Sequence, residues 1–371
     1  MRLSAVLIVR NESRFIDDCL TSLVGEVDEI VVVDTGSTDD TVDRVGRYPV
    51  RLSHFSWCDD FSAARNAAIE RASGDWILYI DADERLRPLD PAWRLRLDWA
   101  TLAAARLRLH PRVGWTAYSE LRLFRRDPRI RFEGVVHERV HGTVNAVCRA
   151  DGLAIGEAAV ALDHVGYEDD PAAKAPRNLP LLRRYLAENP DRIYCWWHLG
   201  DTLKAIGDEA GSLEAWRNGI AAIARLPESS VGDSESTPYV ALIQHLHERG
   251  ERVDELLRDA RARFPRHLVL AWIEAKIALE RGHVDRALPV FQALAAIDAD
   301  GFHDDHVAYD KALFTHIAQE SLALSMFRLG RFAEAAAHYR SAARTAPDRR
   351  ELLLKATLAA SRAVPEPSAP P

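Results

Sequence analysis

The chain has 371 residues, enough for two domains with hydrophobic cores of their own. Its formal net charge of −8 at pH 7, with arginines dispersed among acidic residues, argues against general nucleic-acid binding. The 4 cysteines lack the paired spacing of zinc or redox sites, and no apolar stretch approaches the roughly 18 residues of a membrane span. We therefore expect a cytoplasmic protein without an integral membrane segment, for which peripheral association with a membrane acceptor stays open.

An apolar run at residues 5–9 is typical of a buried strand of an α/β sheet. Polar Arg10, Asn11 and Glu12 end this run. Apolar side chains then recur at three- and four-residue spacing over residues 15–23, which predicts a helix. Glu12 has two interpretations at this position: a ligand-facing carboxylate, or a first-turn helix acid favoured by the helix dipole.

A second apolar run at residues 30–33 ends at Asp34 and leads into the turn Thr-Gly-Ser-Thr-Asp, in which Gly36 can adopt positive φ. The hydroxyl and carboxyl side chains of this turn, Ser37 among them, are candidate N-caps for a helix that starts near Thr41. Backbone amides at such a strand-to-helix turn suit an anionic or polar ligand.

Residues 59–71 are predicted to form an amphipathic helix that carries Arg65, and a third strand at residues 76–80 delivers Asp81 and Asp83 to its C-terminal end. Strands that alternate with helices indicate a parallel sheet, whose ligands bind beyond the carboxyl ends of the strands. Two carboxylates one residue apart are hard oxygen ligands for Mg²⁺ or Mn²⁺. The alternative is that both are solvated loop residues that cap a following helix.

Four segments, VRNES, VVVDTGSTDDT, DDFSAARNAA and DWILYIDADE, follow one another in an order and spacing that resemble the family 2 glycosyltransferases of the GT-A fold. The chain is similar above all to the bacterial subgroup that carries tetratricopeptide repeats after the catalytic domain. The likeness continues in LRLFRRDPRIRFEGVVHERV and DHVGY, and so covers residues 1–167. The resemblance implies an α/β GT-A domain that binds a nucleotide-sugar. It also implies a metal-dependent, inverting, hexosyltransferase-like transfer of the sugar to a hydroxyl, thiol or amine.

The resemblance implies nucleotide-binding roles for residues of the first three motifs. Asp34 accepts a hydrogen bond from the ring N–H of the base, which favours uracil and hence a UDP-sugar donor, and Glu12 meets the base or the ribose. Ser37 lies in the same nucleotide-binding turn. Arg65 offers a planar fork suited to a diphosphate or to Asp81, or else it is a solvated arginine on a helix face.

The resemblance also implies a metal site with Mn²⁺ or Mg²⁺ as cofactor, built on Asp81 and Asp83. Asp81 bridges ribose and metal, and Asp83 binds the metal directly. His164 in DHVGY is the expected third protein ligand, or else a histidine packed at the domain junction. His137 competes for this role and is also a catalytic candidate.

Glu138 is the candidate general base, because a carboxylate can take the proton of the acceptor as the glycosidic bond forms. Its alternative role is a structural ion pair with Arg139 or Arg131. Arg125 and Arg126 follow a strand-like segment and either contact phosphate or acceptor or form a solvated basic turn.

The segment between Glu84 and His137 is short and rich in arginine and alanine, which predicts a small or open acceptor region. The identity of the acceptor, a peptide or a glycan, therefore cannot be inferred from a relative. Two other functions stay open. Nucleotidyl transfer needs a glycine-rich loop with a lysine after the first strand, and a catalytically inactive scaffold would use only the repeats.

The composition changes after residue 167, where the segment EDDPAAKAPRNLP marks a predicted domain boundary. We expect a GT-A glycosyltransferase domain at residues 1–170 and a tetratricopeptide-like helical repeat domain at residues 171–363. The tail, residues 364–371, is expected to be disordered.

Three segments of the C-terminal part share one template, and a weaker copy turns at Gly250. Each places a glycine between two helices, a small residue five positions later and an aromatic residue nine positions after the glycine, as in the tetratricopeptide unit. Such repeats stack into a solenoid, which serves acceptor docking or homodimer formation, or only stabilises the enzyme. Trp196 and Trp197 fit helix–helix core better than a sugar-stacking platform. The template positions are Gly207, Ser212 and Trp216; Gly282, Ala287 and Phe291; and Gly330, Ala335 and Tyr339.

Overall fold

The computed structural model describes residues 1–166 and 171–363 of the chain. Two predictions from the sequence therefore lie outside the described residues. One concerns Tyr167, the last residue of DHVGY, and the other concerns the tail, residues 364–371.

The chain divides into two compact units. The first comprises Met1–Val113 with Ala117–Arg225, and the second comprises Gly114–Thr116 with Leu226–Pro371. The first unit thus contains most of the sheet. It also contains three helices of the predicted repeat domain: α6 (Pro171–Glu188), α7 (Ile193–Ala205) and α8 (Glu209–Arg225). The domain limits expected from the sequence stay predictions.

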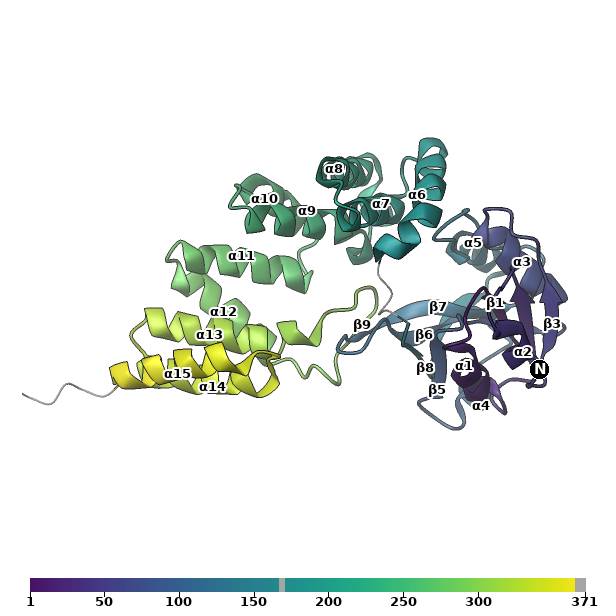
Figure 1. Cartoon of the computed structure of the whole chain (residues 1–371), viewed down its shortest axis with the longest axis horizontal. Helices are drawn as coiled ribbons and strands as arrows, with labels where there is room; N and C mark the ends of the chain where they lie inside the picture. The colour runs from purple at the N-terminus through teal and green to yellow at the C-terminus, as the bar shows by residue number, and fades with distance from the viewer. Residues whose placement is uncertain (167–170, 364–371) are drawn as a thin grey trace, which may run out of the picture. The chain divides into compact units, whose positions relative to one another are not determined.

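The three apolar runs form neighbouring parallel strands in the first unit (Figure 1). β1 (Leu3–Val9) pairs with β2 (Glu29–Asp34) on one side and with β4 (Trp76–Tyr79) on the other. β3 (Arg51–His54) extends the parallel part beside β2. The sequence did not predict β3, because its exposed and half-buried side chains form no apolar run.

Helices α1 (Ile16–Leu23) and α3 (Phe61–Arg71) cover opposite faces of these strands. Leu7 of β1 belongs to the core that contains Leu20 of α1, whereas Val6 belongs to the core that contains Ile69 of α3. Successive side chains of a strand point to opposite faces, and a parallel sheet buries both. This is why these strands read as continuous apolar runs.

The remaining strands make the sheet mixed. β7 (Ala117–Arg125) pairs antiparallel with β4 and with β6 (Leu102–His110). β8 (Ala154–His164) then pairs parallel with β6 and antiparallel with β5 (Glu84–Pro88). The predicted α/β class of the N-terminal part is confirmed. The other helices of this unit are α2 (Thr41–Val45), α4 (Trp93–Arg96), α5 (His141–Asp151), α6 (Pro171–Glu188), α7 (Ile193–Ala205) and α8 (Glu209–Arg225).

The second unit is built almost entirely of helices, as the sequence predicts. In chain order it contains η1 (Glu228–Ser230), η2 (Asp233–Ser236), α9 (Thr237–Glu248), α10 (Asp254–Arg263), α11 (Leu268–Glu280), α12 (Val284–Ala295), β9 (His303–Asp304), η3 (Lys311–Leu313), α13 (His316–Arg328), α14 (Phe332–Thr345) and α15 (Arg349–Ala363).

The glycines of the repeat template join consecutive helices as predicted. Gly207, Gly250, Gly282 and Gly330 all have positive φ, between 73° and 90°, a backbone conformation that glycine adopts without steric cost. The small and aromatic template positions are buried between the paired helices. The helix–turn–helix character of the C-terminal part is therefore confirmed.

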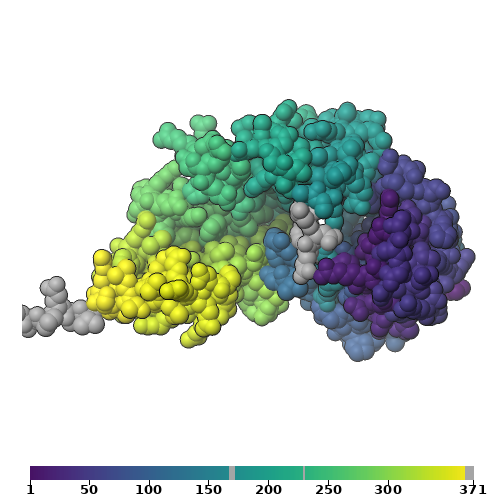
Figure 2. Space-filling model, in the orientation of Figure 1, coloured from purple at the N-terminus to yellow at the C-terminus, as the bar shows by residue number. Residues whose placement is uncertain are grey.

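Alanine-rich packing holds the last helices together. Ala335, Ala342 and Ala356 are buried in one core formed by α13, α14 and α15. At the yellow end of the colour scale, α14 and α15 form one continuous packed mass in the space-filling view (Figure 2). Among the helices that the structure describes, none is both long enough and apolar enough to cross a membrane.

Candidate active site

Polar segments follow the carboxyl ends of β1, β2 and β4, and so lie at one edge of the parallel sheet. Glu12 follows β1, Asp34 ends β2, and Asp81 and Asp83 follow β4. Because β2 and β4 flank β1 on opposite sides, the strand order reverses here, and such positions bind ligands in α/β sheets. Asp83 is followed directly by strand β5, so the two carboxylates do not cap a helix.

Arg65 joins Asp81 to Glu138. Its Nη2 donates to Asp81 Oδ1 over 2.8 Å, and its Nε donates to Glu138 Oε1. The guanidinium also lies over the rings of Tyr79 and Phe132, 5.3 Å and 5.5 Å from their centroids. The side chains of Arg65 and Glu138 are only 12% and 9% exposed. Arg65 is therefore not a solvated arginine on a helix face.

A second buried pair, Arg122 with Glu84, lies beside Asp81. Arg122 Nη2 donates to Glu84 Oε1 over 2.7 Å, and Arg122 Nη1 lies 3.8 Å from Asp81 Oδ2. Glu84 Oε2 accepts the backbone N–H of Asp81 over 2.9 Å. This pair therefore positions the Asp81 backbone and brings a second positive charge to its carboxylate.

The two arginines determine the charge state of Asp81. Burial alone would raise the pKa of Asp81, but the charges of Arg65 and Arg122 outweigh burial and lower it. For Glu84 burial is the larger effect and raises the pKa, although Arg122 opposes it. Asp81 is thus ionised and held between two guanidinium groups.

Asp83 pairs with His164, whose Nε2 lies 2.9 Å from Asp83 Oδ2. Burial lowers the pKa of the imidazole, but the Asp83 carboxylate outweighs burial and raises it. Gly166 is buried against this pair, and a Cβ at that position would overlap the Asp83 carboxylate. The second residue after the end of β8 is therefore a glycine in a place where the Asp83 carboxylate occupies the space of a side chain.

Two of the three predicted metal ligands, Asp83 and His164, are in contact. Carboxylate oxygen and imidazole nitrogen are both donors that Mn²⁺ accepts, so the chemistry of the Asp83–His164 pair fits the cation. Within residues 1–166 and 171–363, no group of three or more His, Cys, Asp or Glu side chains has the geometry to hold a metal ion. His137 lies instead against His198, with ring centroids 3.9 Å apart. Ligand roles for Asp81, Asp83 and His164 stay predictions.

The two loops predicted to bind the nucleotide are hydrogen-bonded to each other. The Asn11 N–H donates to Ser37 Oγ over 3.0 Å, and Asn11 Oδ1 accepts the Thr38 N–H over 2.7 Å. Asn11 has a φ of 58°, a left-handed conformation in which asparagine is enriched. The VRNES and DTGSTDD segments therefore form one structural element at the ends of β1 and β2.

Asp34 is buried and organises its own turn. Its Oδ2 accepts the Gly36 N–H over 3.0 Å, its Oδ1 accepts the Ser37 N–H over 3.1 Å, and His54 Nδ1 lies 3.2 Å from Oδ2. Burial would raise the pKa of Asp34, but the hydrogen bonds from Ser37 and Gly36 outweigh it and lower the pKa. The carboxylate is thus ionised, and its contact with a base stays a prediction.

Glu12 precedes α1 and is not part of its first turn. Its backbone N–H donates to Thr41 Oγ1 over 2.7 Å, which ties it to the start of α2. That helix begins at Thr41 as predicted, but its N-cap is Asp40, without a side-chain bond. The Asp39 carboxylate instead accepts the Thr41 N–H over 3.0 Å.

The family of the N-terminal part follows from its sequence. Residues 4–92 match the model of Glycosyl transferase family 2. The chain carries a family 2 glycosyltransferase domain. The matched segment includes Glu12, Asp34, Arg65, Asp81 and Asp83, but not Glu138, His137 or His164. The predicted resemblance is confirmed.

Two relatives share parts of the chain. A tetratricopeptide-repeat protein of Synechococcus elongatus is 38% identical over 217 residues, which cover 56% of this chain and 53% of that protein. The SPbeta prophage-derived glycosyltransferase SunS of Bacillus subtilis is 35% identical over 139 residues, which cover 36% of this chain and 33% of that protein. The chain thus spans about half or less of the length of these relatives.

Solved structures are more distant. Residues 1–349 of Staphylococcus aureus TarS, in complex with UDP-GlcNAc, align with a TM-score of 0.39 at 16% identity, over 76% of this chain and 92% of that chain. Glucosyl-3-phosphoglycerate synthase of Mycobacterium tuberculosis, in complex with Mn²⁺, UDP and glucosyl-3-phosphoglycerate, aligns with a TM-score of 0.35 at 19% identity, over 50% of this chain and 79% of that chain.

Some residues of the candidate site have no signal in the sequence pattern. Arg122 sits in the buried run of β7, where its neighbours Leu121 and Leu123 indicate only a strand. The sequence pattern instead indicated Arg125 and Arg126 as possible contacts of phosphate or acceptor. Arg125 Nε donates to the Leu102 carbonyl over 2.6 Å and Arg126 Nε to the Gly74 carbonyl over 2.7 Å, so both hold backbone and neither forms a solvated turn.

For Glu138 and Asn11, the sequence pattern only partly indicates the contacts that the structure shows. Glu138 pairs with Arg65, a partner that the sequence did not indicate, while Arg131 pairs with Glu70 over 3.2 Å. The role of Asn11 could have been inferred from its place between a strand and a helix, since asparagine tolerates left-handed backbone.

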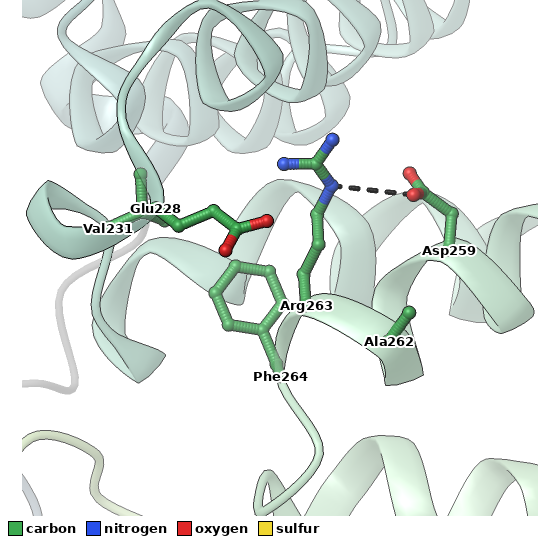
Figure 3. A pocket seen from close by; sticks show the side chains of 6 residues that line it. All are labelled: Glu228, Val231, Asp259, Ala262, Arg263 and Phe264. Atoms are coloured by element: carbon green, nitrogen blue, oxygen red, sulfur yellow. Dashed lines mark hydrogen bonds and ion pairs between the residues drawn. The ribbon is translucent and has the colours of Figure 1, made fainter.

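The second unit has a hollow of about 280 Å³ that contains none of the predicted site residues (Figure 3). Arg263 pairs there with Asp259 over 3.3 Å, and Glu228 extends toward the Phe264 ring. Its lining consists of Glu228, Val231, Asp259, Ala262, Arg263 and Phe264.

Proposed function

We propose that the chain is a metal-dependent, inverting glycosyltransferase. It moves a sugar from a nucleoside diphosphate, with UDP-sugars favoured, to a hydroxyl, thiol or amine of a peptide or glycan acceptor. The observation that carries the proposal is the Arg65 bridge between Asp81 and Glu138. Buried charges cost free energy unless they are paired, and they concentrate at functional sites. The family match of residues 4–92 supports the same activity.

On the donor side, we assign the base and ribose to Glu12, Asp34 and Ser37. The hydrogen bonds that join their loops support this assignment, because they hold the three residues together at the ends of β1 and β2. The diphosphate would lie beyond β4, near Asp81, with Arg65 as the neighbouring cation.

Mn²⁺ or Mg²⁺ would neutralise the charge that develops on the leaving diphosphate. Asp83 and His164 are the residues we assign to hold the cation, and Asp81 is the third candidate. The Asp83–His164 contact and the space left by Gly166 support this assignment.

On the acceptor side, Glu138 removes the proton from the attacking atom of the acceptor as that atom bonds to the anomeric carbon. The bond between the anomeric carbon and the diphosphate oxygen breaks on the opposite face, and the nucleoside diphosphate leaves with the electron pair. The anomeric configuration is therefore inverted. Arg65 orients the Glu138 carboxylate through its Nε–H.

The other functions are less well supported. Nucleotidyl transfer needs a glycine-rich loop with a lysine, and residues 10–15, Arg-Asn-Glu-Ser-Arg-Phe, contain neither residue. An inactive scaffold gives no reason to keep Arg65 and Glu138 paired and buried. Cytoplasmic location, peripheral membrane association and homodimer formation through the repeats stay predictions.

The first test measures donor use. Nucleoside diphosphate release is followed across UDP-, GDP- and dTDP-sugars with Mn²⁺, and donor binding is measured by calorimetry. We expect a UDP-sugar to be bound and turned over. Absence of binding for every donor would support the inactive scaffold instead.

The second test removes a proposed metal ligand. Asp83→Ala is expected to lower metal-dependent nucleoside diphosphate release by more than about 100-fold. Asp254→Ala is the matched control, because it removes a carboxylate that pairs with Arg281 over 2.5 Å in the second unit. Turnover of Asp83→Ala equal to that of the control would contradict the proposed metal site.

A further inference from the structure

Glu138 lies in a loop that is closed by its own backbone, residues 133–139, which we call the base segment. The Glu133 N–H donates to the Arg139 carbonyl over 2.9 Å, and the Arg139 N–H donates to the Glu133 carbonyl over 3.0 Å. The two ends of the base segment are thus fixed to each other. The conformation between them depends on the elements that the segment contacts.

The first turn of α3 holds one side of the base segment. Ser62 Oγ donates to the Gly134 carbonyl over 2.6 Å, and the Phe61 N–H donates to the Val135 carbonyl over 3.0 Å. These bonds involve the residues that come before the turn of the chain at His137. They do not by themselves determine the direction in which the Glu138 side chain leaves the backbone.

Helices α6 and α7 hold the other side. Val136 is buried in one core with Leu182 of α6 and Leu199 of α7. Trp196 packs against the same core, as the repeat template predicts. Both helices belong to the predicted repeat domain, yet the base segment supplies part of the core between them.

Arg192 at the start of α7 contacts the backbone next to Glu138. Its Nη2 donates to the His137 carbonyl over 3.1 Å. This carbonyl belongs to the planar peptide group that joins His137 to Glu138. The Arg192 guanidinium also lies over the Tyr185 ring of α6, 5.5 Å from its centroid, which holds the guanidinium in place. Arg192 therefore fixes the plane of the peptide group from which Glu138 projects.

The backbone at His137 needs such support. Its φ of 48° is left-handed, a conformation that costs free energy for a residue with a Cβ and persists only where the surroundings impose it. The His137 ring is stacked on His198 of α7, with centroids 3.9 Å apart. Helix α7 thus holds both the ring and the carbonyl of His137. Without these contacts the backbone can relax, which would redirect Glu138.

We propose that Arg192 is a positioning residue for the Glu138 base. The proposal rests on the glycosyltransferase activity proposed above and adds a residue of α7 to its machinery. Arg65 orients the Glu138 carboxylate from α3, and Arg192 holds the Glu138 backbone from α7. The two arginines thus fix the base at both ends of its side chain. Arg192 acts through Glu138 and takes no part in the proton transfer.

Arg225 of α8 provides a matched control. Its Nη2 donates to the Pro190 carbonyl over 3.0 Å, and its Nε donates to Asp191 Oδ1 over 2.8 Å. Arg225 thus makes the same kind of bond to a backbone carbonyl, but it holds the turn between α6 and α7 instead of the base segment. A purely structural role of Arg192 predicts similar effects for the two arginines.

The test uses the full-length protein with Mn²⁺ and water as acceptor. Nucleoside diphosphate release is followed with UDP-glucose, UDP-N-acetylglucosamine, GDP-mannose and dTDP-glucose. Glu138 then takes the proton from the water whose oxygen bonds to the anomeric carbon, and the nucleoside diphosphate leaves. Arg192→Met should lower kcat by about 10-fold or more and change the donor KM by less than about twofold, because a displaced base slows the reaction without weakening donor binding. Arg225→Met should leave both constants within about twofold of the wild type.

A double-mutant cycle shows whether Arg192 acts through Glu138. Glu138→Gln removes the base, so adding Arg192→Met to it should lower kcat by less than about twofold further. Amide hydrogen exchange, measured by mass spectrometry, should become faster within residues 133–139 in Arg192→Met and stay unchanged there in Arg225→Met. If Arg192→Met does not fold, Arg192→Lys takes its place. It keeps the positive charge but loses the planar fork, and should still lower kcat by about threefold or more.

The outcomes separate this proposal from the proposed function. An unchanged kcat in Arg192→Met overturns the role of Arg192 alone. So does unchanged exchange in residues 133–139, or an equal fall of kcat with and without Glu138→Gln. Absence of nucleoside diphosphate release by the wild type from all four donors overturns the glycosyltransferase proposal, and the Arg192 proposal with it.

Discussion

The first unit buries two arginine–glutamate ion pairs, in addition to the exposed ion pairs that both units carry. In the first unit, the side chains of Arg122 and Glu84 are 9% and 3% exposed, and the Arg65 pair is similarly buried. In the second unit, the pair of Arg281 with Asp254 lies at the surface, with side chains 51% and 37% exposed. Exposed pairs contribute little to stability because water screens them, whereas breaking a buried pair leaves an uncompensated charge.

The two units also differ in the kind of side chain that they bury. The helices of the second unit bury alanine, leucine and aromatic residues, and charged side chains stay outside. The edge of the sheet instead buries charged residues. Folding alone does not require these charges to be removed from water. Four predictions test this contrast, and they are given from the largest expected effect to the smallest.

Arg65→Met should have the largest effect on stability. It takes the Arg65 partner from the buried carboxylate of Glu138 and leaves Asp81 with Arg122 as its guanidinium neighbour, so the free energy of unfolding should fall by about 3–5 kcal/mol. The measurement is urea unfolding followed by circular dichroism. Arg281→Met is the matched control and should shift the transition far less. Equal losses in the two variants would remove the contrast between the units.

A second prediction concerns His267, a buried titratable group of the second unit. Its Nδ1 accepts the Leu270 N–H at the start of α11 over 3.4 Å. Burial lowers the pKa of His267 to about 4, below its value in the unfolded chain, so the unfolded state binds the proton more tightly. Stability is therefore complete above about pH 7 and falls as the pH drops toward 4, by up to about 3 kcal/mol.

The control for this pH dependence is His267→Asn, because asparagine caps a helix without titrating. The variant should lose less stability than the wild type between pH 7 and pH 4 in thermal unfolding. Identical pH profiles would mean that His267 is not a neutral buried cap.

The third prediction tests the space around the proposed metal ligand. Gly166→Ala introduces a Cβ that overlaps the Asp83 carboxylate, so the carboxylate must move. We expect the Mn²⁺ concentration for half-maximal nucleoside diphosphate release to rise by about 10-fold or more. At Gly232 in the second unit a Cβ meets nothing closer than 3.5 Å, so Gly232→Ala should leave this concentration unchanged. A normal metal requirement in Gly166→Ala would contradict the assignment of Asp83.

The fourth and smallest effect is expected for Ser37→Ala, which removes the acceptor of the Asn11 N–H. Loss of one hydrogen bond between the loops should cost about 1 kcal/mol and raise the KM for the donor by about fivefold. Ser230→Ala removes a bond of 2.8 Å from Ser230 Oγ to the Pro227 carbonyl in the second unit and should leave KM unchanged. An unchanged donor KM in Ser37→Ala would show that the bond between the loops is not needed for binding.

Local sequence carries enough information for several elements. The runs that became β1, β2 and β4 are apolar because both faces of a parallel strand are buried, so Asp34, Asp81 and Asp83 could be placed at strand ends without a structure. The glycine turns were predicted for a similar reason, since positive φ at a helix–helix turn favours glycine. Strand β3 was not predicted, because an edge strand with exposed side chains forms no apolar run.

The sequence by itself thus determined the two classes of fold, the family of the N-terminal part and the carboxylates after β4. Only the tertiary structure decided which charges pair. Arg65 and Glu138 are 73 residues apart, and Arg122 and Glu84 are 38 residues apart. Such contacts depend on how α3 and β7 pack on the sheet, and a periodic pattern within one element does not encode its distant neighbours. For the same reason, the stacking of His137 on His198 of α7 is a contact between segments far apart in the sequence, which no local pattern encodes.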